Sequence, residues 1–78
     1  MENDKNNNII YDEEMVSTWI DNFKSSGVSV ESAIEEAKSS LSNERIWQKG
    51  SDTQEQINIH EQNMANINEY IKRLEAIE

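Results

Sequence analysis

The chain of 78 residues contains no cysteine and no proline, and each absence excludes a class of structure. Without cysteine it can form neither a disulfide nor a thiolate metal site, and the redox compartment is left open. Without proline, and with two glycines in all, it suits long uninterrupted helices. Apolar residues make up 35% of the sequence, which is little for a globular core but enough for a narrow seam between helices.

Long apolar runs are also missing. No stretch of the sequence is apolar enough over the length needed to cross a membrane, and the N-terminus lacks the basic and apolar regions of a cleaved signal peptide. We therefore expect a cytoplasmic protein, or one exported without a cleaved signal peptide.

Basic residues are few. Seven of them stand against 16 acidic residues, which gives a formal charge of -9. Nucleic-acid backbones and anionic membranes repel such a chain, so we expect it to bind neither directly. Protein partners, some with a basic surface, are the expectation that remains.

The strongest pattern lies near the C-terminus, where mostly apolar residues recur at alternating steps of three and four. The positions are Ile57, His60, Met64, Ile67, Ile71 and Leu74. This spacing puts one stripe along a helix, at the a and d positions of a heptad. Ser51 followed by Gln54 forms a capping box, and Asp52 adds negative charge at the helix start. We predict a helix over about 52–76.

A second stripe with the same spacing precedes it. Its positions are Val16, Ile20, Phe23, Gly27, Val30, Ile34, Ala37 and Leu41. Asp12 is expected to cap this helix, and the heptad phase continues through Gly27, which favours one helix over about 12–43. A glycine followed two residues later by Ser29 is also typical of one helix ending and another beginning. A break at Gly27 into a three-helix arrangement is therefore the alternative.

Together these patterns predict an all-α fold, an antiparallel helical hairpin over 11–78 after a disordered polar tail over 1–10. The apolar pattern is lost from Glu44 to Lys49, which is read as the last turn before Gly50. A hairpin this small has a thin core, so we expect self-association or a protein partner to complete it.

Six residues are candidates for contact with that partner. They lie at the hairpin turn or on the outer flank of the stripes: Trp47, Gly50, Trp19, Met15, Ile59 and Tyr70. A tryptophan at a hairpin tip is typical of a protein contact. Plugging the end of the seam is the alternative role for Trp47, and a place in the core is the alternative for Trp19.

Other polar residues are expected to be structural. His60 has no second ligand at helical spacing, so it is read as a polar seam residue that fixes register and not as a metal site. Asn63, Asn66 and Asn68 flank the stripe; exposure is favoured for them over a role in selecting the oligomeric state. Adjacent glutamates such as Glu35 and Glu36 diverge by about 100° around a helix and do not form an acid–base pair. We expect no catalytic site, no metal and no cofactor.

The turn carrying Trp47 and Gly50 between two helices, in an acidic chain, resembles the WXG-type substrates and partner proteins of type VII secretion. In that family a tryptophan–any residue–glycine turn joins the arms of a helical hairpin, which dimerises into a four-helix bundle. In this sequence two residues separate Trp47 from Gly50, and Tyr70 is followed four residues later by Leu74 and not by an acidic residue. The resemblance implies a substrate, co-substrate or targeting partner of a secretion machine.

The sequence therefore predicts a small non-enzymatic module for protein–protein interaction. One alternative is a phage-type acidic inhibitor, an anti-defence protein or DNA mimic that blocks a nucleic-acid-binding host protein, because the charge of -9 sits on a small helical body. A further alternative is a small secretion chaperone. Salt separates the first two, since binding dominated by charge weakens with ionic strength and burial of an apolar seam barely responds.

Overall fold

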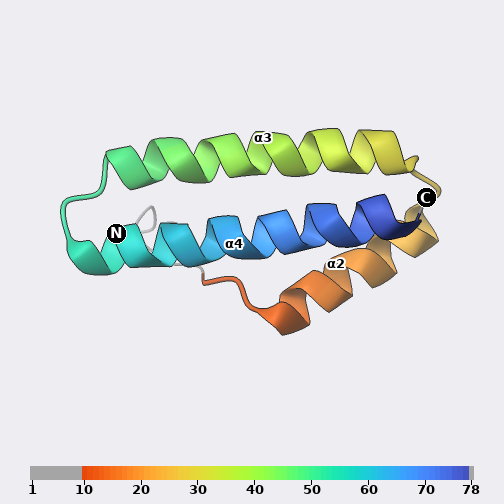
Figure 1. The fold of residues 1–78 in the computed structure, drawn as a ribbon, viewed down its shortest axis with the longest axis horizontal. Helices are drawn as coiled ribbons and strands as arrows, with labels where there is room; N and C mark the ends of the chain where they lie inside the picture. Colours follow the sequence, from red (N-terminus) through yellow and green to blue (C-terminus); the bar gives the residue numbers. More distant parts are fainter. Residues whose placement is uncertain (1–9, 78) are drawn as a thin grey trace.

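The structure, a computed structural model, describes residues 10–77. These residues form three helices and no strand, so the fold is all-α as predicted: α2 over Glu13–Ser26, α3 over Val30–Lys49 and α4 over Gln54–Ile77. Figure 1 shows α3 and α4 side by side and antiparallel, with α2 along the other side of α4. The predicted tail over 1–10 lies outside the described residues except for Ile10, which is exposed.

Helix α2 begins where its capping signal predicts. Asp12 has extended backbone angles, and its carboxylate accepts a hydrogen bond from the Met15 amide at 2.9 Å. Glu13 and Glu14 place negative charge in the first turn, where the helix dipole favours it. The prediction of Asp12 as the cap is therefore confirmed.

The single helix over 12–43 is wrong, and the three-helix alternative describes the chain. Gly27 adopts a left-handed conformation with φ of 77°, which ends α2, and the Ser29 hydroxyl then accepts from the Ser32 amide at 3.1 Å to cap α3. The heptad phase persists across the break because α2 and α3 both turn an apolar face toward α4. An unbroken phase shows that two segments share a packing partner; it does not show that they form one helix.

We expect Gly27→Ala to lower the free energy of unfolding by roughly 1 kcal/mol, because a β-carbon disfavours the left-handed conformation. The strain is purely conformational, since a β-carbon at this position would meet no atom within 4 Å. Gly50→Ala is the matched control: Gly50 has φ of -89° and room for a β-carbon, so its substitution should leave stability nearly unchanged. Urea denaturation followed by circular dichroism measures both, and equal effects would contradict the assignment of the break.

The turn between α3 and α4 is held by the end of α3. The Gly50 amide donates to the carbonyl oxygens of Ile46 and Trp47, at 3.2 and 3.1 Å. The predicted capping box at Ser51 is wrong: the Ser51 hydroxyl donates to the Trp47 carbonyl oxygen at 2.9 Å, which closes α3. The Thr53 hydroxyl accepts from the Gln56 amide at 3.2 Å instead, so α4 begins at Gln54, two residues after the predicted start at Asp52.

The core is a thin layer between α4 and its two neighbours. Its buried apolar residues are Val16, Ala33, Ala37, Ile67 and Leu74. All but Ala33 belong to the predicted stripes. Three polar residues are equally buried, namely Glu44, His60 and Asn63. The core therefore contains a polar section as well as an apolar one.

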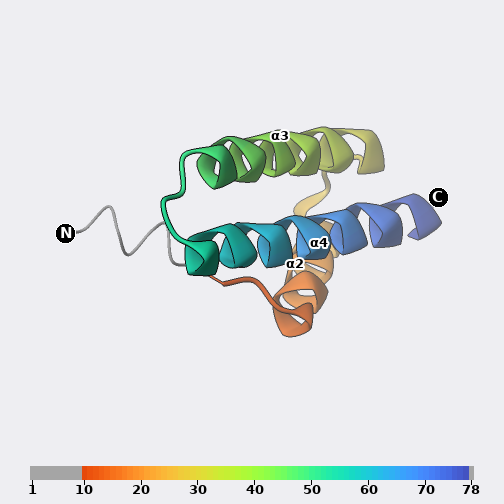
Figure 2. The same ribbon diagram turned by 60° about the vertical axis from the view of Figure 1, so that its left-hand side comes forward.

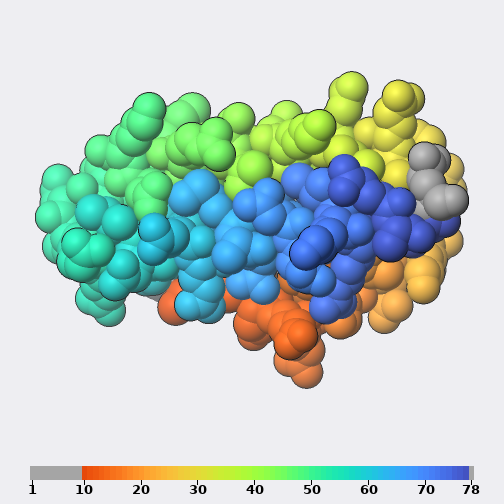
Figure 3. Space-filling view, in the orientation of Figure 1, coloured from red at the N-terminus to blue at the C-terminus, as the bar shows by residue number. Residues whose placement is uncertain are grey.

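The three helices do not form a closed bundle. α2 and α3 each pack against α4, and they diverge from the turn at Gly27 (Figures 1 and 2). In the space-filling view α4 fills the front between α3 above and α2 below, and α2 projects from the body (Figure 3). The angle between α2 and α3 leaves open space over one side of α4, and the candidate site lies there.

Candidate functional site

The six predicted contact residues lie in three separate places. Trp19 on α2 and Tyr70 on α4 contact each other, with their ring centroids 5.5 Å apart, and Met15 is half-buried one helical turn before Trp19. Trp47 and Gly50 lie at the turn between α3 and α4, at the opposite end of the molecule from the turn at Gly27 (Figure 1). Ile59 is half-buried in the first half of α4. The predicted residues therefore do not form one surface.

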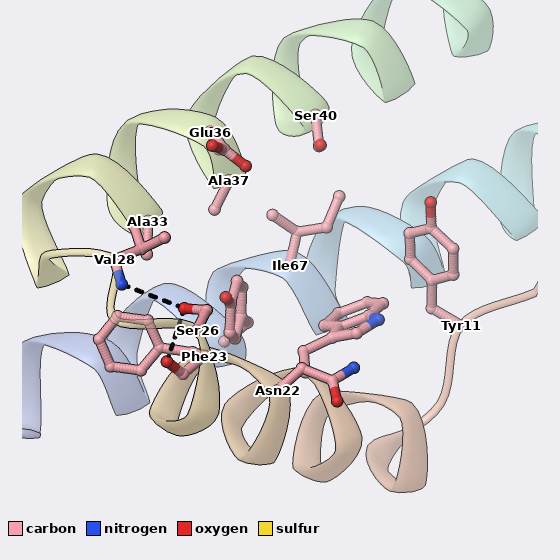
Figure 4. Close-up of a pocket in the computed structure, with 12 residues that line it drawn as sticks. Tyr11, Asn22, Phe23, Ser26, Val28, Ala33, Glu36, Ala37, Ser40 and Ile67 are labelled. Carbon is pink, nitrogen blue, oxygen red and sulfur yellow. Dashed lines mark hydrogen bonds between the residues drawn. The ribbon is translucent and has the colours of Figure 1, made fainter.

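Two of the six, Trp19 and Tyr70, line a groove of about 430 Å³ between α2 and α3, and Met15 lies outside its lining. Its apolar lining comes from all three helices and from the turn between α2 and α3: Trp19, Phe23, Val28, Ala33, Ile67 and Tyr70. Figure 4 shows Ile67 pointing from α4 into the space between the other two helices, with Ala33 and Ala37 on the α3 wall. The volume falls within the roughly 300–1,000 Å³ of sites that hold a ligand.

The turn at Gly27 fixes the narrow end of this groove. The Ser26 hydroxyl donates to the Phe23 carbonyl oxygen at 2.8 Å and accepts from the Val28 amide at 3.2 Å (Figure 4). Both Phe23 and Val28 line the groove. The bonds that end α2 therefore also position two apolar side chains of the site.

Three aromatic rings form the wide part of the groove. Tyr11 meets Trp19 edge to face at 5.0 Å and 89°, and Trp19 meets Tyr70 at 5.5 Å and 67°. Such edge-to-face pairs contribute about 0.5–1.5 kcal/mol each beyond the area that they bury. Burial raises the pKa of Tyr11 and of Tyr70 above the ordinary value, and the carboxylates of Glu44 and Glu36 respectively raise each further. Both hydroxyls therefore stay neutral over a wide range of pH.

A buried polar cluster lies in the seam between α3 and α4. Glu44 on α3 is 3% exposed, and its Oε1 lies 2.7 Å from His60 Nδ1 and 3.2 Å from Asn63 Nδ2, which donates to it. The Trp47 ring covers the imidazole, with centroids 6.1 Å apart. The alternative reading of Trp47, as a plug at the end of the seam, describes this contact, although 46% of Trp47 remains exposed.

The polar cluster also holds the chain that enters α2. The Tyr11 amide donates to Asn63 Oδ1 at 2.7 Å, and the Tyr11 carbonyl oxygen accepts from Gln62 Nε2 at 2.9 Å and Asn66 Nδ2 at 3.2 Å. Both ends of one peptide segment are thus bonded to side chains of α4. Because the Tyr11 ring lines the groove, the cluster positions one wall of the site.

Two expectations about polar residues need correction. Asn63 and Asn66 were expected to be exposed, but Asn63 is 2% exposed and bonds both Tyr11 and Glu44, and Asn66 is half-buried and bonds Tyr11; Asn68 is exposed as expected. The pattern also does not end at Glu44. Steps of three and four from Leu41 reach Glu44 and Gln48, whose Nε2 donates to the Ile57 carbonyl oxygen at 3.2 Å. Continuing the heptad past its last apolar residue would have found both.

His60 lies in the seam as predicted, and it bonds a carboxylate that sequence reasoning did not assign to it. Within residues 10–77, no three His, Asp or Glu side chains gather in a way that could hold a metal ion. No helix in the same span combines the length and apolar character needed to cross a membrane. Comparison with protein-family models, with curated proteins and with solved structures gave no match.

Proposed function

We propose that this protein is a small acidic, non-enzymatic binding module whose groove receives a helix of a partner protein. The observation that carries the proposal is the open apolar groove between α2 and α3, in which Trp19 and Tyr70 are only half-buried. Aromatic side chains are the residues that most often dominate protein interfaces. An apolar surface left open to water in this way marks a site where another molecule binds.

The shape of the groove favours a helix as the occupant. Its two walls are helices that both pack on α4 and diverge from each other, so a further helix has room to lie between them over α4. The α3 lining extends from Ala33 to Ser40, which is about 10 Å, or two helical turns. Two apolar side chains at positions i and i+4 of a partner helix would fit that length.

Three other readings have weaker support. A role like that of the WXG-type secretion partners is supported by the turn at Trp47 and Gly50 between antiparallel helices, but α2 on α4 is an element that a two-helix hairpin does not have. A DNA-mimicking inhibitor needs its charge in one strip, whereas exposed acids lie on all three helices: Glu13, Asp21, Glu31, Glu35, Glu61 and Glu75 among others. A secretion chaperone would use the same groove and is included in the proposal.

A peptide titration tests the groove. Trp47→Phe leaves Trp19 as the sole tryptophan, so its fluorescence reports on the groove alone. We expect a neutral amphipathic peptide of about 18 residues, with leucines at i, i+3, i+4 and i+7, to bind and shift the Trp19 emission to shorter wavelength. Ser40→Phe fills the groove from an exposed lining position and should weaken binding about tenfold or more, equivalent to about 1.4 kcal/mol.

Ser39→Phe is the matched control, because Ser39 is also exposed on α3 but does not line the groove. A peptide of the same composition in scrambled order controls for general stickiness. Equal binding to both phenylalanine variants, or no preference for the amphipathic order, would remove the groove as the binding surface.

A further inference from the structure

The groove carries charge of one sign. Glu36 is the single charged residue among the described residues that line it, and no lysine or arginine of residues 10–77 lines it. Glu36 is exposed on α3 and forms no ion pair with another described residue. Glu36 lines the groove from α3, and its carboxylate adds to the effect of burial in raising the pKa of Tyr70, which lines the groove from α4. An unpaired carboxylate beside an apolar groove favours an occupant that brings a cation.

On this basis we propose that the partner helix is basic and amphipathic, with two apolar side chains four residues apart seated on Trp19 and Ile67 and a lysine or arginine paired with Glu36. This inference rests on the groove being the binding surface. The chain as a whole supports it, because a formal charge of -9 attracts a basic segment and orients its approach.

A second copy of this chain is the less favoured occupant. Each copy carries a charge of -9, so association brings like charges together, and the groove of each copy adds Glu36 at the contact. Exposed acids also lie on each of α2, α3 and α4, for example Glu13, Glu31 and Glu75. A basic helix from another protein replaces that repulsion with attraction.

Three peptides with the same leucine pattern test the charge preference against the Trp47→Phe protein. One carries lysine at the positions flanking the leucines, one carries glutamine and one carries glutamate. At low salt we expect the lysine peptide to bind about tenfold more tightly than the glutamine peptide and the glutamate peptide to bind most weakly, with the difference shrinking as salt is added.

Glu36→Gln identifies the specific pairing. It should weaken binding of the lysine peptide about threefold, as an exposed ion pair does, and leave binding of the glutamine peptide unchanged. Glu35→Gln is the matched control, because it removes the same charge from the neighbouring exposed position outside the groove. Circular dichroism of both variants checks that the fold is retained.

The outcomes separate this inference from the function on which it rests. If no peptide binds in a way that Ser40→Phe weakens, the groove is not the binding surface and the proposed function fails. If the three peptides bind equally, or if Glu36→Gln and Glu35→Gln act alike, the groove binds helices but does not select a cation, and only this inference fails. A dimer by light scattering that Ser40→Phe dissolves would assign the groove to a second copy and would also overturn it.

Discussion

His60→Leu is expected to lower the free energy of unfolding by roughly 3 kcal/mol or more, because it removes the imidazole that pairs with the buried Glu44 carboxylate and leaves only the bond from Asn63. The Glu44 and His60 side chains are 4% and 3% exposed, so water cannot replace the lost bond without opening the seam. The leucine side chain fills most of the space that the imidazole occupied. The cost therefore comes from the buried Glu44 carboxylate, which has lost its bond to the imidazole, and not from a cavity. Chemical denaturation with tryptophan fluorescence measures the loss.

A second substitution separates that cause from simple misfit. Adding Glu44→Gln to His60→Leu should recover more than 1 kcal/mol, because glutamine carries no charge and its oxygen still accepts from Asn63 Nδ2. Glu75→Gln, at an exposed position of α4, is the control for a lost negative charge and should change stability by less than about 0.5 kcal/mol. Glu44→Gln alone completes the comparison. If the stability losses of the two single variants add up to the loss of the double variant, Glu44 and His60 are not coupled.

Leu74→Ala is the other substitution with a large expected effect. Leu74 is fully buried near the end of α4, and truncating such a leucine costs about 2–5 kcal/mol through lost burial and the cavity left behind. Ile77→Ala, on the same helix but at a residue 45% exposed, should cost less than about 0.5 kcal/mol. The urea midpoint of unfolding should fall much further for Leu74→Ala than for Ile77→Ala. Similar midpoints would mean that the apolar stripe of α4 is not the face that packs.

The local signals in the sequence predicted most of the fold. Asp12 and Ser29 begin helices because their side chains can bond free amides three residues on, and that chemistry needs no knowledge of the rest of the chain. The stripe containing Ile67 and Leu74 is likewise a property of one helix. Helix α4 was therefore predicted, with a start two residues too early because the capping box expected at Ser51 does not form.

The groove could not be predicted in the same way. It exists because α2 folds back onto α4 at Gly27, and the favoured sequence reading extended the helix through that residue on the strength of an unbroken heptad phase. Trp19 and Tyr70 were each predicted to contact a partner, but their meeting across 51 residues of sequence depends on that turn. Glu44 was missed for a different reason. A glutamate is rarely buried without a partner, and the partner that explains it lies 16 residues away on another helix.

The bonds to the Tyr11 backbone have a consequence for how tightly the groove can bind. α2 is fastened at both ends, by Asn63, Gln62 and Asn66 at its start and by the turn at Gly27 at its end. A wall fastened in this way is preorganised, so an incoming helix does not have to spend part of its interaction energy on ordering the receptor. Loosening the Tyr11 backbone would remove no contact between the groove and the incoming helix. It would still weaken binding, because α2 would have to become ordered again in each binding event and would lose conformational entropy.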